Sequence, residues 1–277
     1  MYTAKFLFTA LLVACAPIAI ANPNQPDINI QTIGFYSMLH PEVKQLTQNN
    51  FNKNFPADYA NLFKQNPNVS KQQFIAYSNQ HLENIISKRR EGSLKQAHVR
   101  FNVLNSNKDD KITLNEFQAI GLKTFAGFDK NQDGIINAED IKLAPQQQGT
   151  HDGLRITTPL AMPMANNIQE FIQTYGQTKN YVTLANYLTE RDKQFFAVDQ
   201  NQDFVLSEQE YVNEFMQRYD QNLTQARQQY QIIFAQQFDA IAKNKSTINA
   251  KHLNQYAVAV FKSLDRNKNG ILDPSEI

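Results

Sequence analysis

The chain has 277 residues and is nearly neutral, with 27 Lys and Arg residues against 26 Asp and Glu residues and a formal net charge of +1. A chain of this length can bury one or two hydrophobic cores. Its balanced charge gives no support to a nucleic-acid partner. Its single cysteine, Cys15, excludes a disulfide framework.

Residues 1–21 have the pattern of an export signal. Lys5 supplies the charged start, an apolar run follows, and Ala19-Ile20-Ala21 forms a small-x-small cleavage site. We expect cleavage after Ala21 and a periplasmic or secreted protein. A membrane-spanning interpretation is weaker, because the apolar run is short and contains Pro17.

The segment Leu12-Val13-Ala14-Cys15 also resembles a lipoprotein box. In that alternative, Cys15 would become the lipidated first residue and would anchor the protein to a membrane. We favour simple cleavage because apolar residues continue well past Cys15.

Residues 22–56 contain four prolines that would interrupt a long helix, so we expect a partly ordered N-terminal extension there. Helical periodicity begins at about Asp58 and continues to Phe117, with Ser70 as a candidate N-cap. Residues 62–73, with Val69 at the eighth position, have the outline of a further loop. We interpret them as an ordinary helix junction.

Residues 105–116 (NSNKDDKITLNE) are the first of four twelve-residue segments with oxygen-bearing side chains at alternate positions. Ca²⁺ takes six to eight oxygen ligands, so a short loop that binds it must point alternate residues inward. The candidate ligands at positions 1, 3, 5, 7 (through the backbone carbonyl) and 12 are Asn105, Asn107, Asp109, Lys111 and Glu116. Asn105 at position 1 and Asp110 at position 6, where a positive φ favours Gly, predict weaker binding than in an ideal loop.

Residues 129–140 (DKNQDGIINAED) fit the pattern best, with Gly134 at position 6 and Ile136 at position 8. The candidate ligands are Asp129, Asn131, Asp133, Ile135 through its carbonyl, and Asp140. This segment resembles the calcium loop of the EF-hand family. The family usually has Glu at position 12, so the shorter Asp140 predicts weaker or less selective binding, with Mg²⁺ as the alternative ion.

The resemblance implies an all-α fold of helix–loop–helix units, which pair through short β-bridges between the eighth residues of two loops. Ile112 and Ile136 are 24 residues apart, so we expect them to form a first pair within residues 57–144. Residues 145–166 contain three prolines and no helical period, which predicts a linker and a domain boundary. His151 and Asp152 lie in this linker, and we interpret them as solvated rather than catalytic.

Two more loops follow, at residues 199–210 (DQNQDFVLSEQE) and 265–276 (DRNKNGILDPSE). The candidate ligands are Asp199, Asn201, Asp203, Val205 and Glu210 in the former, and Asp265, Asn267, Asn269, Ile271 and Glu276 in the latter. Phe204 at position 6 predicts backbone strain of about 1 kcal/mol or more. The chain stops one residue after Glu276, so we expect fraying to loosen that ligand.

Counting 24 residues upstream from Leu206 and Leu272 reaches Val182 and Ile248. The surrounding segments, 175–186 and 241–252, keep the outline of the loop, but Tyr, Gln, Lys and Ile hold the ligand positions. We therefore expect second and third pairs within residues 167–277, each with one degenerate loop. The repeat predicts six units, three pairs and at most four ions.

These observations predict an exported calcium-binding protein in which the ion is structural or forms a scaffold. The alternative is a calcium-dependent sensor or adaptor that binds a protein or peptide through an exposed apolar groove. The chain has few of the methionines typical of such grooves. An enzyme is a remote alternative, because there is no Gly-x-Ser-x-Gly motif, no zinc-type His pair and no thiol after cleavage.

Overall fold

The computed structural model describes residues 27–144, 160, 165, 167–273 and 275–277. Within these residues, no helix is both long and apolar enough to cross a lipid bilayer. The predicted signal segment and most of the predicted linker, including His151 and Asp152, lie outside the described residues.

The described chain is mostly helical, and the predicted all-α class is confirmed. Its helices are α1 (Ile28–Leu39), α2 (Gln48–Asp58), α3 (Ala60–Gln65), α4 (Lys71–Leu104), α5 (Leu114–Phe128), α6 (Ala138–Leu143), α7 (Ile168–Tyr175), α8 (Leu184–Val198), α9 (Glu208–Ala242) and α10 (Ala250–Leu264). Ser70, Thr113 and Ser207 each cap the following helix with a reciprocal capping box, as their sequence context favours.

Short strands lie between the helices and pair two by two. They are β1 (Leu46–Thr47), β2 (Val69–Ser70), β3 (Lys111–Thr113), β4 (Ile135–Ile136), β5 (Val182–Thr183), β6 (Val205–Ser207), β7 (Thr247–Ile248) and β8 (Ile271–Leu272). All pairs are antiparallel, and they are nested: β1 with β8, β2 with β7, β3 with β6, and β4 with β5. The described chain is thus folded back on itself like one large hairpin.

The predicted loop partners were wrong. Ile112 was expected to pair with Ile136, but it pairs with Leu206, and Ile136 pairs with Val182. Ile248 pairs with Val69, and Leu272 pairs with Leu46. The reason is that one uninterrupted 15-residue helix lies between the two loops of each expected pair. These helices are α5, α8 and α10. A helix of that length is about 22 Å long and holds its two flanking loops apart.

The N-terminal residues also differ from the expectation of a partly ordered extension. Residues 28–58 form α1, β1 and α2, and Tyr36, Phe51 and Phe55 are fully buried. The segment 62–73, which we expected to be a simple helix junction, contains β2 and has β7 as its partner. The described chain therefore has four pairs of loops rather than three.

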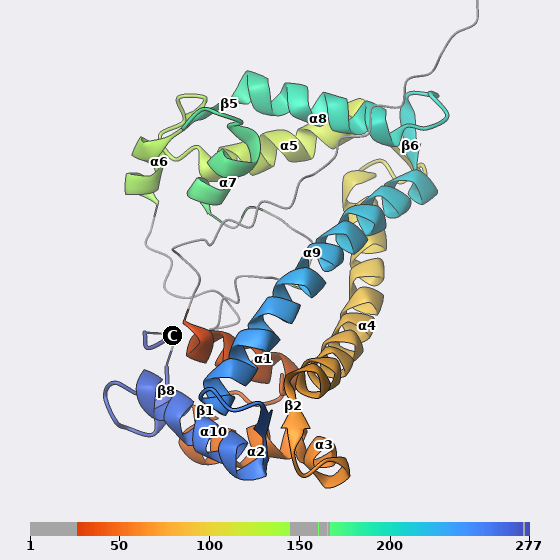
Figure 1. Cartoon of the computed structure of the whole chain (residues 1–277). Helices are drawn as coiled ribbons and strands as arrows, with labels where there is room; N and C mark the ends of the chain where they lie inside the picture. The colour runs from red at the N-terminus through yellow and green to blue at the C-terminus, as the bar shows by residue number, and fades with distance from the viewer. Residues whose placement is uncertain (1–26, 145–159, 161–164, 166, 274) are drawn as a thin grey trace, which may run out of the picture.

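The two long helices α4 and α9 lie side by side and run in opposite directions (Figure 1). Three ion pairs join them: Lys71–Asp239 (2.7 Å), Arg227–Glu83 (2.6 Å) and Arg90–Asp220 (3.0 Å). In addition, Nδ1 of His98 lies 2.8 Å from Oε1 of Glu208. From Lys71 to Arg90, each step forward along α4 is matched by an equal step backward along α9, so these contacts define the register of an antiparallel helix pair.

The remaining helices gather at the two ends of this pair, with α5 to α8 at one end and α1, α2, α3 and α10 at the other (Figure 1). One hydrophobic cluster follows α4 and α9, a second joins the first helices to α10, and a third lies between α5, α7 and α8. Elements from before and after residues 145–166 thus pack against each other, whereas we expected each side to pair within itself.

Candidate metal centre

The four predicted calcium loops have one common backbone form. Each loop starts at the residue that ends a helix, namely Asn105, Asp129, Asp199 or Asp265. In each loop the fourth and sixth residues have a positive φ: Lys108 and Asp110, Gln132 and Gly134, Gln202 and Phe204, and Lys268 and Gly270. The sequence predicted this at position 6 but not at position 4, where Lys and Gln carry no signal for it.

The carboxylate at position 12 closes each loop. In the loop 129–140, Asp140 is fully buried, and its Oδ1 accepts from the backbone N–H of Lys130 (2.7 Å) and Asn131 (3.3 Å). Its Oδ2 accepts from the N–H of Asn137 (2.8 Å). The shorter side chain therefore still spans the loop from its second residue to its ninth.

Glu116, Glu210 and Glu276 make the same kind of contact. Glu116 accepts from the N–H of Ser106 and of Thr113, both at 2.9 Å, and Glu210 accepts from those of Gln200 (3.1 Å) and Ser207 (2.9 Å). These bonds hold both carboxylates inside the loop.

Glu276 is 3% exposed and accepts from the N–H of Arg266 (2.8 Å) and Asn267 (3.1 Å). The final residue, Ile277, packs against the hydrophobic cluster that joins the first helices to α10. In the structure Glu276 thus lies inside its loop, beside a packed final residue.

Hydrogen bonds hold Glu116 and Glu210 in their charged form. Burial raises the pKa of Glu116, but hydrogen bonds from Thr113, Ser106 and Asn107 outweigh it and lower the pKa to about 2. For Glu210, burial likewise opposes the bonds from Ser207 and Gln200, which lower its pKa. Both groups are therefore anionic at neutral pH.

The side chains at positions 1, 3 and 5 turn toward the loop backbone. In the loop 129–140, Asp129 Oδ2 accepts from the N–H of Gly134 (2.9 Å), Asn131 Oδ1 from that of Asp133 (3.1 Å), and Asp133 Oδ1 from that of Ile135 (2.8 Å). In the other two loops, the corresponding oxygens accept the same three backbone bonds; they belong to Asp199, Asn201 and Asp203, and to Asp265, Asn267 and Asn269.

The loop 105–116 keeps only part of this arrangement. Asn105 Oδ1 accepts from the N–H of Asp109 (3.2 Å), as Asp199 does from Asp203. Asn105 is 1% exposed, so a neutral amide takes the buried first position. This loop therefore has one fewer carboxylate at its candidate ligand positions than the loops 129–140 and 199–210, which also have Asn at position 3.

One atom in the loop 129–140 is left without a partner. Asp129 is 7% exposed, and its Oδ1 is buried with no hydrogen-bond partner in the described part of the chain. A buried carboxylate oxygen without a donor is costly unless a cation or an ordered water meets it. The oxygen-rich donor set of this loop fits a hard cation such as Ca²⁺.

Carboxylates alone do not make these sites. No group of three or more His, Cys, Asp or Glu side chains among the described residues is arranged to hold a metal ion. The candidate ligands in each loop include one or two Asn side chains and a backbone carbonyl, so a complete site would rely on these neutral oxygens as well.

The degenerate loop 241–252 is closed at position 12 without a carboxylate, and its positive-φ residues, Lys243 and Asn244, stand at positions 3 and 4 instead of 4 and 6. In the segment 241–252, His252 takes position 12, and its Nδ1 lies 3.2 Å from the N–H of Asn249. Its Nε2 lies 2.9 Å from Nζ of Lys245, which stands at position 5. Burial and the nearby lysines lower the pKa of His252. A positive side chain at position 5 makes this loop a poor cation site.

The pairing brings two candidate sites together. The loops 105–116 and 199–210 are joined by β3 and β6, with Ile112 opposite Leu206. Lys111 and Val205, whose backbone carbonyls are candidate ligands, lie in the same two strands. The loop 129–140 is instead paired with a degenerate segment through β4 and β5, and the loop 265–276 is paired through β8 with β1.

Comparisons of this chain with protein-family models, with curated proteins and with solved structures found no match.

Proposed function

We propose that this chain is an exported EF-hand protein that binds calcium in up to four loops, where the ion is structural. The proposal rests on one observation above all: a carboxylate at position 12 spans each loop and accepts from the backbone at both ends. The unpartnered oxygen of Asp129 adds to it.

The ligands would come from positions 1, 3, 5, 7 and 12, as the sequence predicts. Bound calcium would supply positive charge among oxygens that otherwise repel one another, and would stabilise the folded chain by mass action. In the loop 129–140, Asp140 would hold the ion with a shorter side chain, and Mg²⁺ is the competing ion there.

A structural role for the ion fits the position of the loops in the fold. The loops 105–116 and 199–210 lie where α4 ends and α9 begins, so ions there would fix one end of the long helix pair. The loop 265–276 contains β8, which pairs with β1. An ion in this loop would therefore stabilise the contact between the first and last parts of the described chain.

A sensor or adaptor is the second candidate, and one observation favours it. Phe196 and Phe204 are 49% and 69% exposed, and their rings lie 6.4 Å apart at the loop 199–210. Exposed aromatic side chains suit a protein partner. Calcium-dependent binding of a hydrophobic dye would favour the sensor, and a raised melting temperature without dye binding would favour the structural role.

Thermal unfolding with matched variants tests the proposal. We expect millimolar calcium to raise the melting temperature of the wild-type protein above its value in chelator, and Glu210→Gln to reduce that increase. His252→Gln changes the same position of a degenerate loop and should leave the increase unchanged. Equal melting temperatures in calcium and in chelator for the wild-type protein would refute the proposal.

A further inference from the structure

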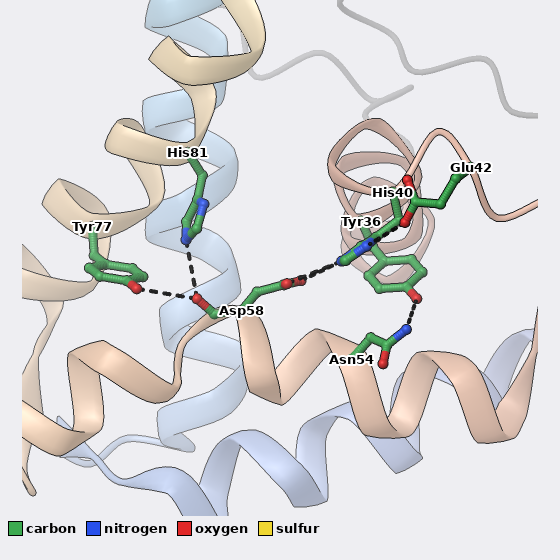
Figure 2. A network of polar contacts seen from close by, with 7 residues as sticks. All are labelled: Tyr36, His40, Glu42, Asn54, Asp58, Tyr77 and His81. Atoms are coloured by element: carbon green, nitrogen blue, oxygen red, sulfur yellow. Dashed lines mark hydrogen bonds and ion pairs between the residues drawn. The ribbon is translucent and has the colours of Figure 1, made fainter.

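A second polar cluster lies away from the calcium loops, at the end of α1. The ring of His40 stands between two carboxylates (Figure 2). Its Nδ1 is 3.2 Å from Oε1 of Glu42, and its Nε2 is 3.1 Å from both Oδ1 and Oδ2 of Asp58. Both ring nitrogens of His40 therefore face hydrogen-bond acceptors.

The cluster joins three helices. Asp58 is the last residue of α2, and its backbone carbonyl accepts from the hydroxyl of Tyr77 (3.3 Å) and lies 3.2 Å from Nε2 of His81, both on α4 (Figure 2). On α1, the ring of Tyr36 packs 4.5 Å from the ring of His40. His40 and Asp58 are largely shielded from solvent, with side chains 20% and 16% exposed.

The protonation state of His40 decides how many of these contacts are favourable. A neutral imidazole has one N–H and one lone pair, so it can donate to only one of the two carboxylates. The other nitrogen then turns its lone pair toward an anionic oxygen. The imidazolium donates from both nitrogens and makes two charge-assisted hydrogen bonds.

Several titratable groups surround the ring of His40. The titratable groups that face it are Glu42, Asp58 and Tyr36, with Tyr77 and His81 reached through the Asp58 carbonyl. Burial raises the pKa of Tyr36 and of Tyr77, so both stay neutral well above pH 8. Imidazole is the one kind of side chain that ordinarily changes charge between about pH 5 and 8.

His81 takes a different part in the cluster. Its Nε2 faces a carbonyl oxygen and can donate in either charge state. Protonation of His81 therefore adds no new hydrogen bond to the cluster, and this makes it a useful control.

We propose that His40 is a proton-operated latch that fastens the end of α1 to the end of α2 when its ring is protonated and loosens when the ring is neutral. The latch holds the last turn of α1, where the N–H of His40 donates to the carbonyl of Tyr36 (3.0 Å) and the N–H of Val43 donates to that of His40 (3.0 Å). Beyond this turn, β1 pairs with β8, so the latch steadies the contact between the two ends of the described chain.

Hydrogen exchange of the wild-type protein without metal tests the latch, and it does not depend on calcium binding. After correction for the intrinsic rate, the protection of the His40 and Val43 amides should fall by roughly tenfold between pH 5.5 and pH 8.0, as expected for one lost charge-assisted bond. His40→Gln should abolish this dependence on pH, and His81→Gln should preserve it.

Two outcomes would overturn the proposal: wild-type protection that is equal at the two pH values, or a His40→Gln variant with the wild-type dependence. If that variant does not fold, NMR titration of the wild-type rings decides the question. The midpoint of the change in amide protection must coincide with the titration of the His40 ring, and coincidence with the His81 ring instead would overturn the latch.

Discussion

Phe204 is the residue at which sequence and backbone disagree most. It has a φ of 65° and is exposed, with Phe196 as its aromatic neighbour. A positive φ costs an L-residue roughly 1–2 kcal/mol, whereas Gly adopts it freely. Two of the other candidate loops, 129–140 and 265–276, have Gly at this position and follow that preference.

We therefore expect Phe204→Gly to raise the free energy of unfolding by about 0.5–1 kcal/mol, since the gain exceeds the entropy that Gly adds to the unfolded chain. The reverse change, Gly134→Ala, should cost about 1 kcal/mol through φ alone, because nothing lies within 4 Å of the added Cβ. Chemical denaturation measures both. A destabilised Phe204→Gly variant would mean that the contact with Phe196 outweighs the strain.

Glu116 links stability to pH. Its pKa falls from an ordinary value of 4.5 to about 2 in the folded chain, so its contribution is fully present above pH 4.5 and is lost as pH falls toward 2. In metal-free protein, Glu116→Gln should flatten the dependence of unfolding free energy on pH in this range. An unchanged slope in the variant would show that other carboxylates carry the acid sensitivity.

At the scale of the element, the contact of α5 with α8 depends on a glycine. Arg191 of α8 lies across Gly121, with its guanidinium 3.9 Å from the centre of the Phe117 ring and bonded to the Phe117 carbonyl. A Cβ at position 121 would collide with the Arg191 side chain. Gly121 therefore leaves room for the Arg191 side chain to lie against α5, although helix propensity alone disfavours a glycine there.

Gly121→Ala should lower the free energy of unfolding by about 1 kcal/mol or more, although Ala is the better helix former by about 1 kcal/mol. The control is Gly92→Ala in the middle of α4, where nothing lies within 4 Å of the added Cβ and propensity should raise stability by up to about 1 kcal/mol. If both variants gain stability, Arg191 moves aside at little cost.

At the scale of the whole molecule, the nested pairing makes the first helices depend on the last. Phe51 and Phe55 of α2 lie 6.2 Å and 6.4 Å from the rings of Phe261 and Tyr256 of α10, and the Thr32 and Tyr256 hydroxyls are 2.9 Å apart. Removal of α10 and its flanking strands would take away the partners of β1 and β2.

A chain that ends at Ala242 should therefore lose hydrogen-exchange protection in residues 28–70 as well as at its new end. Residues 114–142 and 168–198, which pack together at the other end of the long helices, should stay protected. Protection of residues 28–70 that survives this truncation would contradict the nested fold.

The sequence predicted local structure far better than partners. Spacing and chemistry predicted the cap at Ser70 and the all-α class, because these depend on residues close together in the chain. Partner choice depends instead on whether a helix such as α5 continues or breaks between two loops. Gly121 and Gly127 lie inside α5 without breaking it, so composition did not settle the question.

The cluster at His40 was missed for a similar reason. His40 and Asp58 are 18 residues apart and lie in a segment with four prolines nearby, where we expected little order. Only the buried packing of α1 and α2 against α10 brings them together. No periodicity in the sequence marks such a contact.

The proposal of calcium binding is tested most directly by calorimetric titration of the metal-free chain without residues 1–21, with calcium at physiological magnesium. We expect three or four bound ions. The fourth depends on the loop 105–116, where Asn105 replaces a carboxylate and weakens binding. A titration with no binding heat and no bound calcium would mean that the four loops serve only as turns between helices.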